Sequence, residues 1–132
     1  MSDGLDNIEA FEGAWVRGRL IPAEWNRLSH AVIGAAMRVH SSLGPGLPER
    51  VYTAALCHEL AKAGFVFQRE LSVNVLYDGA CVGVLRLDLL VGGVLVVEVK
   101  AVESVPDVHL AQLVSYLRAG KYPLGLLVNF NV

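Results

Sequence analysis

The sequence has few cysteines, little charge of either sign and no long apolar run. Its two cysteines, Cys57 and Cys81, lack neighbouring ligands at metal spacing, which excludes structural zinc and iron–sulfur sites, since both need about four ligands. We expect reduced thiols in a cytoplasmic protein. No apolar run reaches the roughly 20 residues of a membrane-spanning helix, and no basic segment followed by an apolar one marks a signal peptide.

The charge balance limits the class of partner. The net charge is −2 and the pI is about 6.0, whereas a dedicated nucleic-acid-binding protein usually has a basic surface. Contact with nucleic acid would therefore be local, metal-mediated or built by an oligomer. At 132 residues, 54% hydrophobic and 18% charged, the chain is expected to fold as one domain. We assign residues 22–132 to that domain and residues 1–21 to an arm, flexible or packed on a partner.

Periodicity predicts the order α-α-β-β-β-α-β, an α/β (α+β) fold with a mixed four-stranded sheet flanked by helices. The expected helices cover residues 23–41, 48–63 and 107–119, and the expected strands cover residues 65–77, 81–91, 94–101 and 123–130. Asp78-Gly79 is a hairpin turn signal. The last helix makes a crossover, so the last strand should lie parallel to a neighbour. Two stripes are expected on that helix: an apolar one of Val108, Ala111, Val114 and Leu117, and one of His109, Gln112 and Tyr116.

Residues 86–100 carry ionisable groups in an otherwise apolar hairpin. Glu98 and Lys100 share a strand face because strands alternate with period two. A two-residue turn would put Asp88 on the opposite face, whereas a three-residue loop, Gly92 to Val94, places Asp88 opposite Glu98. Glycine supplies the left-handed conformation that such a loop needs. We therefore predict an odd loop or bulge here, with Asp88, Glu98 and Lys100 in one cluster.

Two adjacent carboxylates suit a hard divalent cation, Mg²⁺ or Mn²⁺, because these ions prefer oxygen ligands. The cation would offset the repulsion between Asp88 and Glu98, and the carbonyl of Val99 could be a further ligand. Lys100 could orient or deprotonate a water molecule. The alternative is a structural ion pair of Lys100 with Glu98 or Asp88. The convergence of Asp88, Glu98 and Lys100 on one face of the hairpin favours a functional metal site over a structural ion pair.

The expected buried stripe of the helix over residues 48–63 is Tyr52, Leu56 and Leu60. Glu49 lies one turn before Tyr52 and two before Leu56, on the same side of this helix. An acid in a first helical turn can simply favour the positive end of the helix. Its facing direction, toward the expected sheet, keeps a functional role open.

These residues resemble a known superfamily. Asp88 with Glu98-Val99-Lys100 is similar to the D-x(n)-E-x-K signature of the PD-(D/E)XK nucleases. Gly46 to Tyr52 resembles the motif of the GxxExxY family within that superfamily, and Gln112 to Tyr116 resembles the QxxxY motif of its exonuclease-like branch. Leu124 to Phe130 resembles the closing strand. The resemblance covers residues 24–131.

The resemblance implies a restriction-endonuclease-like core and Mg²⁺-dependent hydrolysis of nucleic-acid phosphodiesters, DNA ranked before RNA. It implies Glu49, Asp88 and Glu98 as acidic metal ligands, Lys100 as catalytic, and Gln112 and Tyr116 as residues that touch the substrate or order the metal shell. His109 would be an accessory or, as the alternative, a structural histidine. The alternatives are a non-catalytic oligomeric scaffold on the same fold, and a small-molecule phosphoesterase. A homodimer would cover part of so apolar a surface.

Overall fold

The computed structural model describes residues 8–13, 16 and 18–131. The expected arm over residues 1–21 therefore lies partly outside the described residues. None of the helices in the described part is long and apolar enough to cross a membrane. The elements, in chain order, are β1 (Ile8–Glu12), α1 (Ala23–Leu43), α2 (Glu49–Lys62), β2 (Phe67–Tyr77), β3 (Ala80–Val91), β4 (Leu95–Lys100), α3 (Asp107–Gly120) and β5 (Leu124–Asn129).

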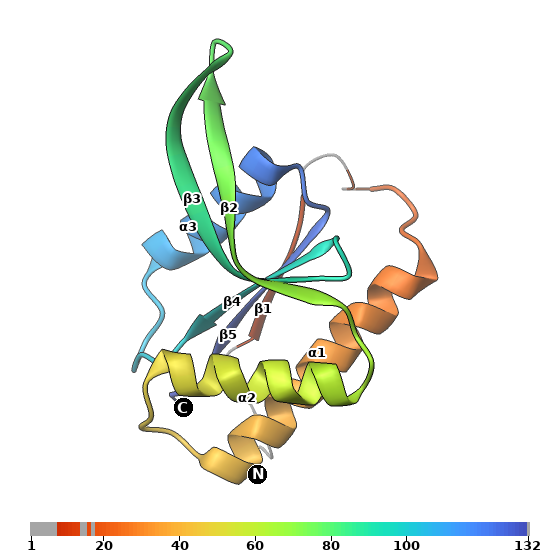
Figure 1. Cartoon of the computed structure of the whole chain (residues 1–132), viewed down its shortest axis with the longest axis vertical. Helices are drawn as coiled ribbons and strands as arrows, with labels where there is room; N and C mark the ends of the chain where they lie inside the picture. The colour runs from red at the N-terminus through yellow and green to blue at the C-terminus, as the bar shows by residue number, and fades with distance from the viewer. Residues whose placement is uncertain (1–7, 14–15, 17, 132) are drawn as a thin grey trace.

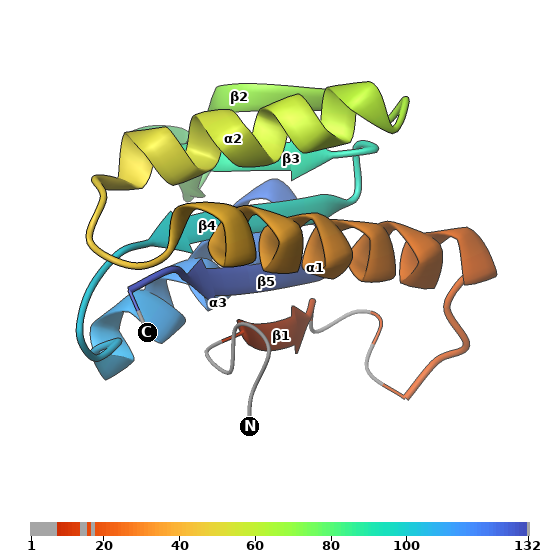
Figure 2. The same cartoon turned by 90° about the horizontal axis from the view of Figure 1, so that it is seen from below.

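The strands form one mixed sheet in the order β1-β5-β4-β3-β2. β2, β3 and β4 form an antiparallel meander. β5 lies parallel to β4 after the α3 crossover, as predicted. Figure 2 shows α1 and α2 lying against one face of the sheet, with α3 behind it. The predicted fold class is confirmed.

Each face of the sheet has its own apolar core. The larger core joins α1 and α2 to the sheet, and it includes the predicted stripe of α2: Tyr52, Leu56 and Leu60. The smaller core joins α3 to the opposite face. On α3 the buried residues are Leu113 and Leu117, whereas Val108 is 60% exposed. The predicted apolar stripe of this helix was therefore wrong at Val108. Leu113 and Leu117, which are four residues apart, pack on the sheet instead.

The sheet has five strands, not the predicted four. β1 pairs antiparallel with β5, with Ile8 opposite Val128. No strand was predicted there, since five residues with only a partial alternation carry little periodic signal. β5 becomes an interior strand and is buried along its whole length, as its apolar sequence indicates.

The loop between β3 and β4 has the predicted odd length. Val91 pairs with Leu95, which leaves Gly92, Gly93 and Val94 in the turn. Both glycines have left-handed φ angles, +61° and +74°, and the N–H of Gly92 donates a hydrogen bond to the Val66 carbonyl. This loop sets the register that brings Asp88 opposite Glu98.

Replacing Gly92 by alanine is expected to lower the free energy of unfolding by about 2–3 kcal/mol. An added Cβ at Gly92 would lie 2.8 Å from Cδ1 of Leu28, whereas one at Gly93 would meet nothing within 4 Å. Gly93→Ala is the matched control, since it keeps the left-handed strain without the contact and should cost about 1 kcal/mol. Equal losses in urea denaturation would show that the contact with Leu28 does not matter.

The hairpin of β2 and β3 changes direction halfway along. The pairing runs from Phe67–Val91 to Arg69–Leu89 and resumes at Leu71–Leu87, so Glu70 and Asp88 fall at an interruption. Glu70 has a left-handed φ of +52°. Leu89 packs in the core of α1 and α2 and Leu87 in the core of α3, although residues two apart on a regular strand share a face. Figure 1 shows the outer half of the hairpin rising away from α1 and α2.

Candidate functional site

Asp88 and Glu98 meet where the ladder between β3 and β4 ends. The last paired residues are Leu89 and Val97. Beyond them, the N–H of Asp88 donates to Oε1 of Glu98 over 3.1 Å, and the N–H of Val99 donates to Oδ2 of Asp88 over 2.8 Å. Each carboxylate therefore accepts a hydrogen bond from a backbone N–H of the opposite strand, as a backbone carbonyl does in a regular sheet. The two side chains are neighbours, as the odd loop predicts.

Burial makes this pair electrostatically unfavourable. Glu98 is only 5% exposed. Burial, and then the charge of Asp88, raise the pKa of Glu98 to about 8, while the nearby charge of Lys100 acts in the opposite direction. Like charges so close together disfavour the doubly ionised state. A cation placed between the carboxylates would restore it.

Lys100 lies at the end of β4 and is half-buried. Within the described part of the chain, it forms no ion pair with Asp88 or Glu98, which removes the main support for a purely structural role. Its backbone is fixed by β5, since the Lys100 carbonyl accepts a hydrogen bond from the Phe130 N–H over 2.8 Å. The buried amide of Asn129 also bonds both the N–H and the carbonyl of Val102. Lys100 thus presents an ammonium group without an ion-pair partner, among the residues that the structure describes, on a firmly held strand end.

The start of α2 is fixed by Tyr52, which positions Glu49. The Tyr52 hydroxyl donates to the Gly44 carbonyl and accepts from the Leu47 N–H over 3.1 Å. Its ring stacks on Phe130 with ring centroids 4.6 Å apart. The tyrosine therefore ties the loop before α2 to the end of β5. Glu49 itself is exposed, as the first residue of α2.

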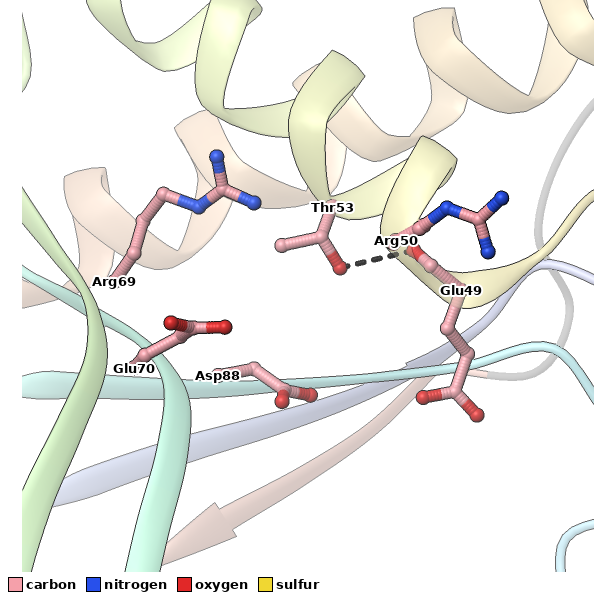
Figure 3. A pocket seen from close by; sticks show the side chains of 6 residues that line it. All are labelled: Glu49, Arg50, Thr53, Arg69, Glu70 and Asp88. Carbon is pink, nitrogen blue, oxygen red and sulfur yellow. Dashed lines mark hydrogen bonds between the residues drawn. The ribbon is translucent and has the colours of Figure 1, made fainter.

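A cavity of about 250 Å³ lies beside Asp88 and is lined by residues of α2, β2 and β3: Glu49, Arg50, Thr53, Arg69, Glu70 and Asp88. Figure 3 shows Glu49 reaching down from the start of α2 and Asp88 pointing toward it from the sheet. The structure thus brings Glu49 and Asp88 to one cavity, as the sequence predicts, whereas the predicted site residues Glu98 and Lys100 are not among the residues that line it.

The predicted substrate residues lie on α3. Tyr116 packs against the smaller core between α3 and the sheet. Burial, and then the charges of Glu98 and Asp88, raise the pKa of Tyr116. Gln112 is exposed and lies one helical turn before Tyr116 on the same side of α3. His109 precedes Gln112 by three residues and is half-buried, and its Nδ1 has no hydrogen-bond partner among the described residues. The stripe of His109, Gln112 and Tyr116 is therefore directed to the side of the sheet that carries Glu98.

The donor set beside Asp88 fits a hard cation with few protein ligands. Asp88 and Glu98 each have a second carboxylate oxygen outside the two bonds to backbone amides. Because the N–H and C=O of a strand residue point to the same neighbour, the Val99 carbonyl is also directed toward Asp88. Carboxylate and carbonyl oxygens suit Mg²⁺ or Mn²⁺. However, no three acidic, histidine or cysteine side chains of residues 8–13, 16 and 18–131 already form a metal-binding group, so Glu49 is not assembled with the pair.

Sequence reasoning missed Arg50, Arg69 and Glu70 as residues of this cavity. Glu70 falls opposite Asp88 in the pairing of β2 and β3. The turn at Asp78-Gly79 gives Tyr77–Ala80 pairing, and an extra residue, Val82, then shifts the register by one. Without that bulge Glu70 would face Leu87, and the sequence carries no clear signal for the bulge. Arg50 follows Glu49 directly in the sequence, and this adjacency was the one signal that could have predicted a cavity residue.

Comparison with known proteins agrees with this geometry. A family model described as the PD-(D/E)XK nuclease superfamily matches residues 26–132. Comparisons with curated proteins and with solved structures gave no match. The matched range includes Glu49, the interlocked pair of Asp88 and Glu98, Lys100, and the α3 stripe. The chain therefore belongs to the PD-(D/E)XK nuclease superfamily.

Proposed function

We propose that this protein is a metal-dependent nuclease that hydrolyses phosphodiester bonds in nucleic acid, with DNA ranked before RNA as its substrate, and that it is a member of the GxxExxY branch. The single observation that carries the proposal is the interlocked pair of Asp88 and Glu98 at the break between β3 and β4. Lys100 adjoins this pair and has no ion-pair partner in the described part of the chain. Such a pair is costly to bury without a cation. The match to the PD-(D/E)XK nuclease superfamily supports a role for that cation in the hydrolysis of nucleic acid.

The roles of the residues follow from their positions. Asp88, Glu98 and the Val99 carbonyl would hold Mg²⁺ or Mn²⁺, with Glu49 joining from α2. When bound, the cation supplies charge stabilisation at the phosphoryl oxygens and at the leaving oxygen. Lys100 would orient the attacking water as an ammonium group, or accept the proton of that water in its neutral amine form. Gln112 and Tyr116, with His109 as an accessory, would contact the substrate from α3.

A second candidate function is a non-catalytic oligomeric binding protein on the same fold. The outer half of the hairpin favours it, because large apolar side chains there are exposed: Leu76 at 65%, Tyr77 at 75%, Val82 at 62% and Val84 at 61%. Exposed apolar patches are typical of protein interaction sites. None of these four residues lines the cavity beside Asp88, so a protein interaction surface on the hairpin would leave that cavity open.

The test is cleavage of DNA and RNA by the purified protein with Mg²⁺, with Mn²⁺ and with a chelator. We expect cleavage only when the metal is present, and expect Asp88→Asn to abolish it. Asp107→Asn is the matched control, since this exposed aspartate begins α3 outside the cavity. Cleavage that persists in Asp88→Asn, or that ignores the chelator, would contradict the proposal. A wild-type protein that cleaves neither DNA nor RNA would leave the binding protein as the better account.

A further inference from the structure

The cavity beside Asp88 holds two guanidinium groups that have no role in the proposed hydrolysis. Arg50 belongs to the first turn of α2 and Arg69 to β2, next to the interruption at Glu70. Both line the cavity with Glu49, Glu70 and Asp88. In the part of the chain that the structure describes, neither arginine forms an ion pair with these carboxylates. Two arginines left unpaired beside carboxylates need another explanation.

The charges in the cavity are separated by sign. Figure 3 shows the carboxylates of Glu49, Glu70 and Asp88 along the side nearest the sheet, and the guanidinium groups of Arg50 and Arg69 along the side of α2. The hydroxyl of Thr53 lies between the two arginines and donates to the Glu49 carbonyl over 3.0 Å. Such a division suits a ligand that carries a cation on one side and an anion on the other.

We propose that Arg50 and Arg69 bind a phosphate of the nucleic-acid backbone next to the bond that is cut. This inference rests on the proposed function for the position of the cleaved bond. A guanidinium presents paired N–H donors that match two phosphate oxygens. The left-handed turn at Glu70, with φ of +52°, changes the direction of β2 directly after Arg69, at the edge strand of the sheet.

The size of the cavity indicates how the phosphate arrives. Its volume of about 250 Å³ is below the roughly 300–1,000 Å³ of pockets that enclose a whole small ligand. A backbone phosphate fits, while the attached sugars and bases stay outside. Recognition of the backbone alone is independent of base sequence. The cavity therefore favours a polymer over a free nucleotide as substrate, which argues against the small-molecule phosphoesterase.

The test measures binding apart from cleavage. A fluorescein-labelled single-stranded DNA of about 12 nucleotides is titrated with protein in Ca²⁺ at several salt concentrations, and its anisotropy is read. Arg50→Ala and Arg69→Ala are each expected to weaken binding about tenfold, and to reduce the slope of log affinity against log salt by about 0.7. Arg69→Lys should fall between wild type and Arg69→Ala, because it keeps the charge and loses the paired donors.

The matched control is Arg27→Ala, which removes the same charge from an exposed position near the start of α1. Figure 2 shows that α1 begins at the end of the molecule opposite to the start of α2. Arg50 and Arg69 are themselves exposed, so their substitution leaves the core intact. Thermal unfolding of each variant checks that point.

The outcomes separate this inference from the proposed nuclease. An unchanged affinity and salt slope in both arginine variants would overturn the phosphate site, even if the wild type cleaves DNA. Wild-type protein that does not bind the oligonucleotide would overturn it as well. Arginine-dependent binding without cleavage of DNA or RNA in Mg²⁺ or Mn²⁺ would support the phosphate site and overturn the nuclease.

Discussion

Replacing Lys100 by methionine is expected to slow metal-dependent cleavage by about a thousandfold, within the 10²–10⁴ range for loss of a positioned acid–base group. The affinity for Mn²⁺ should stay within a few fold of wild type. Lys100 is half-buried and forms no ion pair with Asp88 or Glu98 among the described residues, so its removal leaves both carboxylates in place. Methionine keeps the unbranched apolar stem. Single-turnover cleavage and calorimetric titration with Mn²⁺ measure the two quantities.

The control for this substitution is Lys62→Met. Lys62 lies at the end of α2 and pairs with Glu59 over 3.1 Å, far along the helix from Glu49. This variant should cleave at the wild-type rate. If Lys100→Met cleaves as fast as Lys62→Met, then Lys100 takes no part in the chemistry. A loss of Mn²⁺ binding together with cleavage would instead assign Lys100 to the integrity of the metal site.

Raising the pH from about 5 to 8 is expected to destabilise the metal-free protein by several kcal/mol, of the order of 4 from Glu98 alone. The pKa of Glu98 is about 8 in the folded protein because of burial and the charge of Asp88, and is near 4.3 in an unfolded chain. Between these values the folded state holds a proton that the unfolded state has released. The stabilisation is complete below the unfolded pKa and is lost as the pH rises through the folded pKa.

Urea denaturation at a series of pH values, in a chelator, checks this prediction. Glu98→Gln is the control variant, because an amide keeps the shape of the side chain and cannot ionise. Its stability should vary much less over the same range, and it should be the more stable protein at pH 8. Saturating Mg²⁺ should also flatten the wild-type profile, since the cation stabilises the ionised pair. Parallel profiles of wild type and Glu98→Gln would show that Glu98 ionises normally.

The sequence by itself determined the hairpin of β3 and β4 and the meeting of the two carboxylates that it carries. The two glycines of the β3–β4 loop, and the alternation of apolar residues on either side, fixed an odd loop and hence the meeting of Asp88 with Glu98. That conclusion needed only the period of a strand and the φ angles open to glycine. The helical spacing of Tyr52, Leu56 and Leu60 likewise gave the buried face of α2, because a 3.6-residue period is visible over three turns.

Periodic patterns in the sequence did not predict a feature correctly where the outcome depends on contacts with distant residues. α3 has more than one apolar set at helical spacing, and contact with the sheet selected Leu113 and Leu117 over Val108. The short β1 gains its strand conformation from pairing with β5. In each case the free energy that decides the outcome comes from contacts with residues far away in the chain, which a window of neighbouring residues does not contain.

The cavity beside Asp88 is likewise a product of tertiary structure. The bulge at Val82 shifts the hairpin register by one, and so places Glu70 rather than Arg69 opposite Asp88. The packing of α2 over the sheet then brings Arg50 to Arg69. A one-residue shift reverses every face of a strand. The sequence therefore determined which residues carry charge, while the register and the helix packing decided which of those charges share one cavity.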